Sequence, residues 1–312
     1  MTAPLIGYSD RISVRSGEKI AFKVSSTAST PYHAMLVRIV RGDPNPGGPP
    51  PKLEDLSELF DGRFASRVQH AWPGSYGLVE GAKNVKLPAA LAVEALIWPT
   101  LPEHGPQTVI SRRDAETGAG FALVLTPDGM ALETGGHRVV VGKKLRSRIW
   151  YRVWASADPA TGTLRVGQQP LKRAFGTDDE GDAMATASGL ALDAAQPVMI
   201  GAEAAKDRPA HRCFNGKIEA PAVAGLAAWD FTRRMDSMEI EDIGPNGLHG
   251  RLINLPTRAM KGSAWSGAER DWRRAPHHYA AIHFHDDDLH DCGWLDDFAF
   301  TIPKDMKSGI YG

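Results

Sequence analysis

The sequence predicts an all-β protein built from two sandwich domains, and three observations support this prediction. Apolar residues mostly alternate with polar ones instead of recurring every three or four positions. Clusters of turn-forming residues separate the alternating segments, and the totals of 32 glycines and 22 prolines are high for a helical protein. At roughly 150 residues per domain, the 312 residues are enough for two domains.

Residues 1–67 are expected to supply the first strands of a small sandwich and a linker. The apolar positions that alternate here are Ile20, Phe22, Val24, Met35, Val37 and Ile39. The stretch 42–51 reads GDPNPGGPPP and cannot sustain a strand ladder, because proline lacks an N–H donor and glycine costs backbone entropy. We place a solvent-exposed connection and a boundary there. Residues 52–60, KLEDLSELF, contain the one helical turn expected in the first half.

Residues 68–275 are expected to form a larger sandwich. The strand-like phrases are LAVEALIW, TVISRRD, FALVLTPDGMALETGG, WYRVWASADPATGTLRV and FNGKIEAPAVAGLAAWDF. Hairpin turns at 126–129 and 158–162 are expected to join consecutive strands. Together these phrases resemble laminin-G-like, concanavalin-like jelly-roll domains over roughly half of the chain. The resemblance implies a fold more than a function.

Residues 227–265 resemble the phrase that normally opens a laminin-G-like domain, yet here this phrase comes last. We therefore hypothesise that the sandwich is permuted in sequence. Trp229, Phe231, Leu248 and Leu252 would then complete the sheet from the C-terminal side. The hypothesis requires this segment to lie close to residues 85–100 and 210–220.

Residues 276–312 are expected to return to the small sandwich. Phe298, Phe300 and Ile302 share one face of an alternating segment, which resembles a late strand of an immunoglobulin-like sandwich. Because the first 42 residues contain too few strands to close such a sandwich, we expect the jelly roll to be inserted into it. The immunoglobulin-like sandwich is expected to be incomplete at the C-terminus, since the chain ends near Tyr311 inside a predicted strand.

Composition limits the classes of binding partner and the cellular compartment that we expect for this protein. With 36 Lys and Arg against 37 Asp and Glu, no overall field directs the protein to nucleic acid or to an anionic membrane. No apolar run approaches the length of a membrane helix. The N-terminus lacks a basic segment followed by an apolar one, so we expect an unprocessed cytoplasmic protein. Two cysteines, Cys213 and Cys292, are too few for a disulfide framework.

The densest titratable cluster spans residues 283–291, and no Lys or Arg lies between Arg274 and Lys304. On a strand, His283 and His285 would point to one face, because the side-chain period is two. Two imidazoles with the carboxylate of Asp287 would suit zinc or non-haem iron. Alternatively, the histidines pack under the inserted domain and the aspartates accept backbone N–H groups in a turn. A contact between subunits is the third interpretation.

Other candidate chemistry is open to structural alternatives. Trp150 and Trp154 are expected on the same face of a strand. There they would stack on a sugar or, alternatively, lie in the core. Glu239 and Glu241 are carboxylates at a spacing that would allow glycoside hydrolysis. Asp242 is instead expected to anchor the turn at 244–247. The arginines between 251 and 274, interleaved with tryptophans, suggest RNA binding or, given the neutral chain, a subunit or inter-domain surface.

Longer phrases throughout the chain resemble the large (beta) subunit family of N,N-dimethylformamidase. These phrases are GYSDRISVRSGEKIAFKVSS, VRIVRGDPNPGGP, WDFTRRM, GLHGRLINLPTRAMKGSAW and HYAAIHFHDDDLHDCGWLDDFAFTIPKDMKSGIYG. The last phrase is long and unusual in composition, so it is specific. In that family such modules form the N-terminal half, and an amidotransferase-like domain follows that carries a mononuclear non-haem iron held by tyrosines and a glutamate.

The resemblance implies a scaffold role for this chain. The family hydrolyses dimethylformamide to formate and dimethylamine, but no catalytic residue and no cofactor are expected in the part present here. Implied partners are the catalytic remainder of the large subunit, a small subunit and further copies of the chain. We expect no nucleic-acid or membrane partner. The alternative is a stand-alone lectin-like module that binds carbohydrate on the jelly roll.

Overall fold

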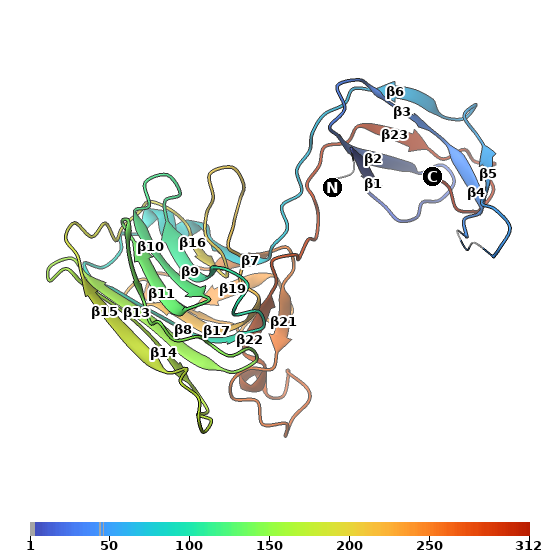
Figure 1. The fold of residues 1–312 in the computed structure, drawn as a ribbon. Helices are drawn as coiled ribbons and strands as arrows, with labels where there is room; N and C mark the ends of the chain where they lie inside the picture. Colours follow the sequence, from blue (N-terminus) through green and yellow to red (C-terminus); the bar gives the residue numbers. More distant parts are fainter. Residues whose placement is uncertain (1–3, 44, 46) are drawn as a thin grey trace. The chain divides into compact units, whose positions relative to one another are not determined.

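The computed structural model describes residues 4–43, 45 and 47–312, and the chain divides into two compact units. Unit 1 combines residues 1–71 with residues 291–312. Unit 2 comprises residues 72–290 and is therefore an insertion in unit 1 (Figure 1). The predicted all-β class is confirmed, and so is the large sandwich.

Unit 1 is assembled from both ends of the chain. Its strands are β1 (Leu5–Ser9), β2 (Lys19–Ser26), β3 (Tyr32–Met35), β4 (Val37–Arg41), β5 (Lys52–Asp55), β6 (Asp61–Phe64) and β23 (Phe298–Thr301). They form a β1-β2-β23 sheet and the antiparallel pairs β3-β6 and β4-β5. The ring of Phe298 lies 5.1 Å from that of Phe22 and 4.4 Å from that of Phe64, between centroids. This aromatic cluster joins the C-terminal strand to the N-terminal ones.

The Pro- and Gly-rich stretch at 42–51 is a connection within unit 1 and does not mark a domain boundary. It joins β4 to β5, although positions 44 and 46 lie outside the described residues. The helical turn expected in KLEDLSELF is corrected in part, because its first four residues are strand β5. Pairing with β4 overrides local propensity there, with Leu53 opposite Ile39. The last residues of the chain also pair with β4, since the Gly312 N–H donates to the Val37 carbonyl at 3.0 Å.

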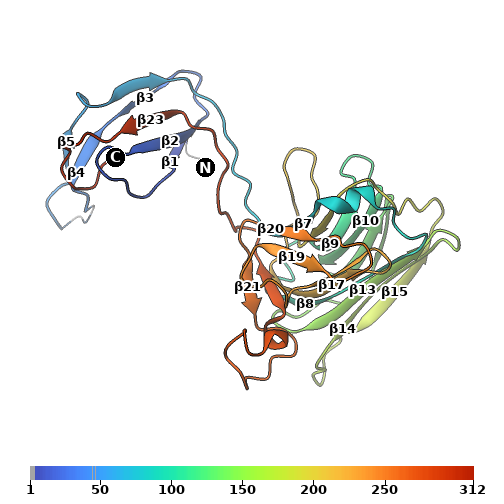
Figure 2. The ribbon, with the colours of Figure 1, turned by 180° about the vertical axis from the view of Figure 1, so that it is seen from behind.

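Unit 2 is one continuous path of strands folded into two facing layers (Figure 2). The strands are β7 (Tyr76–Val79), β8 (Leu91–Pro99), β9 (Gln107–Arg113), β10 (Gly120–Thr126), β11 (Gly129–Thr134), β12 (His137–Val140), β13 (Tyr151–Asp158), β14 (Thr163–Pro170), β15 (Gly181–Thr186), β16 (Val198–Ile200), β17 (Gly216–Val223), β18 (Ala227–Asp230), β19 (Glu239–Asp242), β20 (Gly250–Ile253), β21 (Thr257–Met260) and β22 (Ala281–Phe284), with short 3-10 helices η1 (Glu80–Asn84) and η2 (Pro276–Tyr279). Their order is β12-β11-β10-β9-β16-β7-β20-β19-β18-β17-β8-β13-β14-β15, and β21 and β22 pair beside β17.

The core lies between the two layers. On β8, Leu91, Val93, Ala95 and Ile97 are each at most 2% exposed, and the residues between them face outward. This is the alternation that identified the strand in the sequence. A hydrogen bond also joins the two layers. The Met130 N–H on β11 donates to the Gln168 side chain on β14 at 2.8 Å.

The late segment completes the sandwich as the permutation hypothesis requires. Trp229, Phe231, Leu248 and Leu252 are all buried in the core. Strand β18 pairs with β17, and β20 pairs with β7. Residues 227–253 are therefore hydrogen-bonded to strands of both layers, and the permuted order itself stays a hypothesis.

Unit 2 begins at Trp72, close to the expected residue 68. It ends at His290, whereas the sequence predicts that boundary at residue 275. The difference arises at β22, which we assigned to the small sandwich. Strand β22 pairs antiparallel with β17, with Ile282 opposite Ile218, and both isoleucines are fully buried. The first half of β17 would lose a neighbour without β22, so this strand belongs to the core of unit 2.

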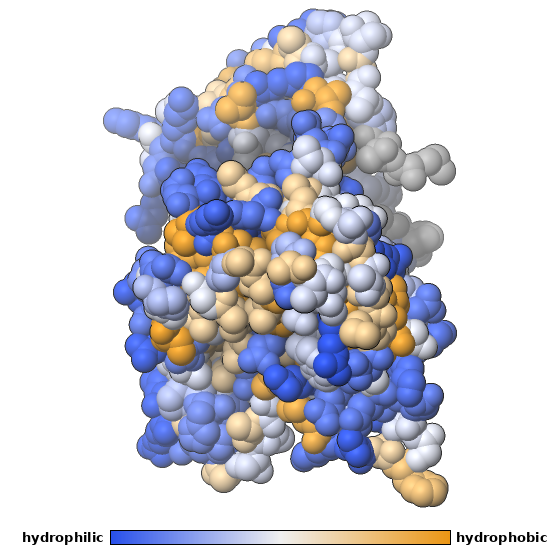
Figure 3. All heavy atoms as spheres, turned by 90° about the vertical axis from the view of Figure 1, so that its left-hand side faces the viewer, coloured by the Kyte–Doolittle hydropathy of each residue, from blue (hydrophilic) through white to orange (hydrophobic). Residues whose placement is uncertain are grey.

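The surface is mostly polar on the face drawn in Figure 3, where hydrophobic residues form small patches between hydrophilic ones. Within the part of the chain that the structure describes, no helix is both long enough and apolar enough to cross a membrane.

Asp242 supplies the first test of this fold. Its carboxylate accepts the N–H groups of Ala228, Gly244 and Leu248 at 2.9, 2.7 and 2.7 Å, as expected for a residue that anchors the 244–247 turn. Asp242→Ala should lower the free energy of unfolding in urea by about 2–4 kcal/mol, because three donors lose a charged acceptor. The exposed Asp236 is the matched control, and its replacement by Ala should change stability by less than about 0.5 kcal/mol. Equal effects would contradict the assignment.

Candidate functional site

The histidine- and aspartate-rich phrase lies where the chain enters and leaves unit 2. The Gly74 N–H donates to the Asp288 carbonyl at 2.8 Å, and the Ser75 N–H donates to the His285 carbonyl at 2.9 Å. These backbone bonds hold the first residues of unit 2 against its last ones. We call residues 72–75, Asn254 and residues 285–290 the clamp.

Side chains reinforce the clamp around one carboxylate. The hydroxyl of Ser75, which is fully buried, donates to Asp288 Oδ2 at 2.7 Å and accepts the His285 N–H at 3.1 Å. His285 Nδ1 lies 3.2 Å from the same oxygen. The carboxylate beside this imidazole is therefore Asp288 and not the Asp287 that we predicted. Asp287 is exposed, because the turn after β22 directs it to solvent.

Asn254 joins the two sides of the clamp from a third segment. Its side-chain amide donates to the carbonyls of Trp72 and Gly74 at 3.0 and 2.9 Å. Its backbone is left-handed, with φ of 60°, a conformation that Asn tolerates better than most residues. Gly74 has φ of 109°, and a Cβ there would lie 2.4 Å from the sulfur of Cys213. This close packing explains why position 74 is glycine.

Cys213 is a packing residue of this region. Its side chain is buried, and burial raises the pKa of the thiol to about 11. The thiol is therefore protonated near neutral pH, where a nucleophile would need the thiolate.

His283 lies on β22 in a row of side chains that crosses three strands. Trp98 on β8 and Lys217 on β17 are opposite one another, and Lys217 is opposite His283. The ring centroid of His283 lies 4.2 Å from that of His285 and 6.3 Å from that of Trp98. Burial, helped by the charges of His285 and Lys217, lowers the pKa of His283 to about 4. The ring is therefore neutral near pH 7, although its buried Nε2 has no hydrogen-bond partner among the residues that the structure describes.

The structure brings His283 and His285 together, as predicted, but not with Asp287. Among the described residues, no three His, Cys, Asp or Glu side chains are grouped so that they could hold a metal ion. The metal site stays a prediction. The hydrogen bonds of His285 and Asp288 favour the structural interpretation, in which both side chains have protein partners.

Sequence reasoning did not identify two further titratable residues whose pKa values are shifted. Lys217 and Glu219 alternate with apolar residues on β17, a pattern typical of a solvent-facing edge, yet both are buried. The segment that contains β21 covers them. Lys217 Nζ donates to the Lys261 carbonyl at 3.2 Å, and the Glu219 carboxylate accepts the Ser263 N–H at 2.7 Å. Burial lowers the pKa of Lys217 and raises that of Glu219, so the charged form of each is disfavoured.

The predicted tryptophans lie apart from the core. Trp154 is half-buried on the outer face of β13, and its ring packs over Gly167 on β14, where a Cβ would lie 2.2 Å away. The Arg152 guanidinium lies 5.3 Å from the centre of the same ring. Trp150 precedes β13 and is also half-buried. The inward face of β13 is occupied by Tyr151 and the alternating small residues after it.

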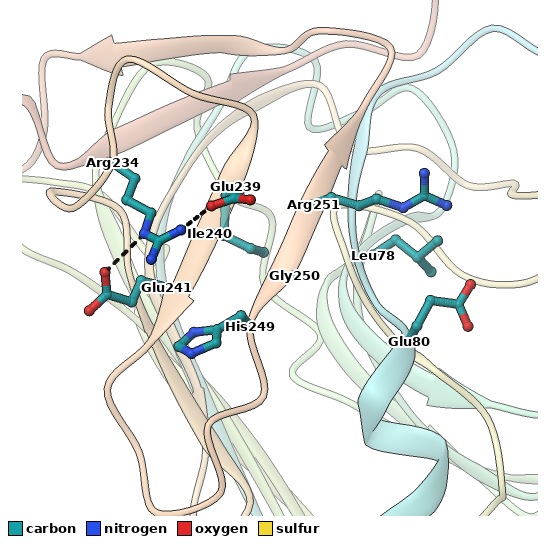
Figure 4. A pocket seen from close by; sticks show the side chains of 9 residues that line it. All are labelled: Leu78, Glu80, Arg234, Glu239, Ile240, Glu241, His249, Gly250 and Arg251. Atoms are coloured by element: carbon teal, nitrogen blue, oxygen red, sulfur yellow. Dashed lines mark hydrogen bonds and ion pairs between the residues drawn. The ribbon is translucent and has the colours of Figure 1, made fainter.

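A cavity of about 390 Å³ on the outer face of β7, β19 and β20 contains the predicted carboxylate pair (Figure 4). Arg234 points between Glu239 and Glu241 and forms ion pairs with both. Arg233 pairs with Glu241 as well, at 2.8 Å. A glycosidase needs one carboxylic acid that stays protonated in apolar surroundings. Both carboxylates instead form ion pairs with arginines, so the geometry does not support glycoside hydrolysis at this pair.

Replacing each aspartate of the neighbouring pair tests the clamp against the metal site. Asp288→Ala should lower the free energy of unfolding by about 1–3 kcal/mol, because Ser75 and His285 lose their acceptor. Asp287→Ala should change the free energy of unfolding by less than about 0.5 kcal/mol.

Elemental analysis of the dialysed chain beside His283→Ala and His285→Gln variants should show no change in metal content. About one equivalent of zinc or iron in the parent, lost in both histidine variants, would contradict the structural interpretation.

The lowered pKa of His283 predicts a pH dependence of stability. Unfolded His has a pKa of about 6.5, so between about pH 6.5 and 4 the unfolded chain binds a proton that the folded chain does not. Stability from this residue should therefore be complete above pH 6.5 and decline as the pH falls toward 4. Urea unfolding across this range should show a smaller pH dependence for His283→Gln than for the parent. Equal slopes would mean that the ring is not buried.

Comparisons with known proteins agree with the sequence phrases. Residues 257–312 match a family described as N,N-dimethylformamidase beta subunit-like, C-terminal. The chain is 32% identical to the N,N-dimethylformamidase beta subunit of Paracoccus aminophilus, over 99% of this chain and 47% of that protein. It is also 32% identical to the same subunit of Alcaligenes sp, over 98% of this chain and 46% of that protein. The chain thus spans about half the length of these curated relatives.

Solved structures give more distant matches. The native heptameric SAP-like pentraxin of Limulus polyphemus covers 61% of this chain and 75% of its own, with 14% identity and a TM-score of 0.32. Ruminococcus gnavus IT-sialidase CBM40 bound to alpha2,3 sialyllactose covers 48% and 83%, with 17% identity and a TM-score of 0.35. On the near full-length sequence matches, the chain belongs to the N,N-dimethylformamidase beta-subunit family.

Proposed function

We propose that this chain is the non-catalytic scaffold region of an amidohydrolase large subunit of the N,N-dimethylformamidase type. The family reaction, hydrolysis of dimethylformamide to formate and dimethylamine, would take place in the remainder of that subunit. The observation that carries this proposal is the clamp. The densest titratable cluster of the chain, residues 283–291, is used to join the beginning of unit 2 to its end.

Amide hydrolysis requires a nucleophile or an activated water, a base, and donors for the developing oxyanion. The residues with shifted pKa values described in the candidate site are engaged in packing. Lys217 and Glu219 are covered by the β21 segment, and the Cys213 thiol is protonated and enclosed. His285 has Asp288 and Ser75 as neighbours. These contacts support a structural role for each group.

In this proposal the mononuclear non-haem iron belongs to the part of the subunit outside this chain. The contribution of the present residues is to hold that part and to contact other subunits. Unit 1 has the surface for such contacts. Among its described apolar side chains, only Ala21, Val24 and Trp294 are less than a tenth exposed. Leu53, Val40 and Ile310 are 58%, 51% and 69% exposed, which favours burial against a partner in the assembled enzyme.

A carbohydrate-binding module is the second candidate, and Trp154 is the observation that favours it. An aromatic ring held flat on a sheet beside an arginine is a surface on which a sugar can stack. Binding of the purified chain to a glycan array, lost in Trp154→Ala without loss of the cooperative melt, would favour this candidate over the scaffold role.

The scaffold role predicts the absence of activity in the isolated chain. The purified 312 residues, with or without added ferrous iron, should release no formate or dimethylamine from dimethylformamide above the buffer blank. The positive control is the complete enzyme of Paracoccus aminophilus in the same assay. Turnover by the isolated chain would overturn the proposal.

A further inference from the structure

A second cavity, of about 610 Å³, lies between the β9–β10 turn and the loop from β16 to β17. The two loops rise side by side from the same end of unit 2 in Figures 1 and 2. The β16–β17 loop is closed at its base by two backbone bonds. The Glu203 N–H donates to the His211 carbonyl at 3.1 Å, and the His211 N–H donates to the Glu203 carbonyl at 2.9 Å. The cavity is thus framed by an ordered loop.

The floor of the cavity contains a buried ionic network. The Glu203 side chain is 5% exposed, and its Oε1 lies 2.8 Å from His211 Nε2 and 3.4 Å from Arg212 Nη1. Glu133, 10% exposed, accepts hydrogen bonds from Arg113 and Arg212 at 2.8 and 2.9 Å. Burying two carboxylates is unfavourable unless cations and hydrogen bonds compensate for the lost hydration. The network fixes the two guanidinium groups in place.

The network leaves N–H donors unused at the cavity. Nε and Nη2 of Arg212 make no hydrogen bond to any described residue, and Lys206 has no ion-pair partner among these residues. The nearest carboxylate to Arg208 is the exposed Asp207, at 4.0 Å. Arg212 also has a left-handed backbone, with φ of 51°, which is costly for a residue with a side chain and is typical of functional positions.

Two of the three carboxylates that line the cavity, Asp114 and Glu203, are occupied, and the third, Asp207, is exposed beside Arg208. Asp114 Oδ1 accepts the N–H groups of Glu116 and Thr117 at 3.0 and 2.8 Å. Its Oδ2 accepts the side-chain amide of Gln196 at 2.8 Å. Glu203 is already held by His211. An incoming ligand therefore meets free cationic donors and few free acceptors, which selects for negative charge.

We propose that this cavity binds a small organic anion of about monosaccharide size, carrying a carboxylate or phosphate group. Arg212, Arg208 and Lys206 donate to the anionic group, and the buried Glu133 and Glu203 hold Arg212 in position. The volume lies within the roughly 300–1,000 Å³ of small-molecule sites. The proposal does not depend on the scaffold role, because none of the residues that line the cavity belongs to the clamp.

The test compares three ligands of similar size by titration calorimetry on the full chain at low ionic strength. Glucuronate carries a carboxylate, glucose 6-phosphate carries a phosphate, and glucose is neutral. We expect binding of at least one of the two anions, weakened by added salt, and no binding of glucose. Comparing glucuronate with glucose 6-phosphate shows whether the cavity binds a carboxylate group, a phosphate group or both.

Variants locate the binding. The exposed pair Lys206→Ala with Arg208→Ala leaves the buried network intact and should weaken anion binding about tenfold. The control double variant, Lys86→Ala with Lys172→Ala, also removes two positive charges, but at other positions on unit 2. It should leave anion binding unchanged. Absence of heat with both anions, equal binding of glucose, or equal weakening in both double variants would overturn the proposal. The melting temperature of each variant, measured in parallel, verifies that the chain remains folded.

Discussion

The hydrogen bonds between Gly74, Ser75 and residues 285–288 are the constraint on which the rest of the structure depends. Unit 2 interrupts unit 1, so the chain must leave unit 2 close to the point where it entered. The backbone bonds of the clamp fix that closeness, and the Ser75, His285 and Asp288 side chains reinforce it. With the two ends of the insertion held together, β2 and β23 can pair although more than 270 residues separate them.

The clamp also explains why a cluster that looks catalytic can be structural. Acidic and imidazole groups close together satisfy one another and several N–H donors at a place where backbone would otherwise be buried without partners. His283 is neutral for a different reason, because desolvation disfavours its charged form. The scaffold role that we propose follows from this use of the titratable residues, and the near full-length match to one half of a larger subunit supports it.

Much of the fold could be predicted from local patterns. Alternation identified β8, and the turn at 126–129 joins β10 to β11 as expected, with Thr126 opposite Gly129. The assignment of β22 to the wrong unit has a different cause. Its partner, β17, lies more than 60 residues earlier, and nothing within the four residues of β22 indicates which sheet they join. The pairing of KLED with β4 was missed for a different reason, because charged residues on an exposed strand resemble an exposed helical turn.

The candidate site shows the same division between local and distant information. The proximity of His283 and His285 follows from strand periodicity, and the role of Asp242 follows from its neighbouring turn. The choice between Asp287 and Asp288 depends on Ser75, which is more than 200 residues away, so the sequence could not make it. The burial of Lys217 and Glu219 likewise depends on the later β21 segment, which turns an apparent solvent face into an interior one.

Native-state hydrogen exchange of the Gly74 and Ser75 amides tests the clamp most directly. Both amides lie in a segment that is not part of a strand, and without the clamp they would exchange as readily as other exposed connections. Our account predicts that both exchange as slowly as the amides of β17, because their acceptors are the carbonyls of Asp288 and His285. Fast exchange at Gly74 and Ser75 while β17 remains protected would contradict it.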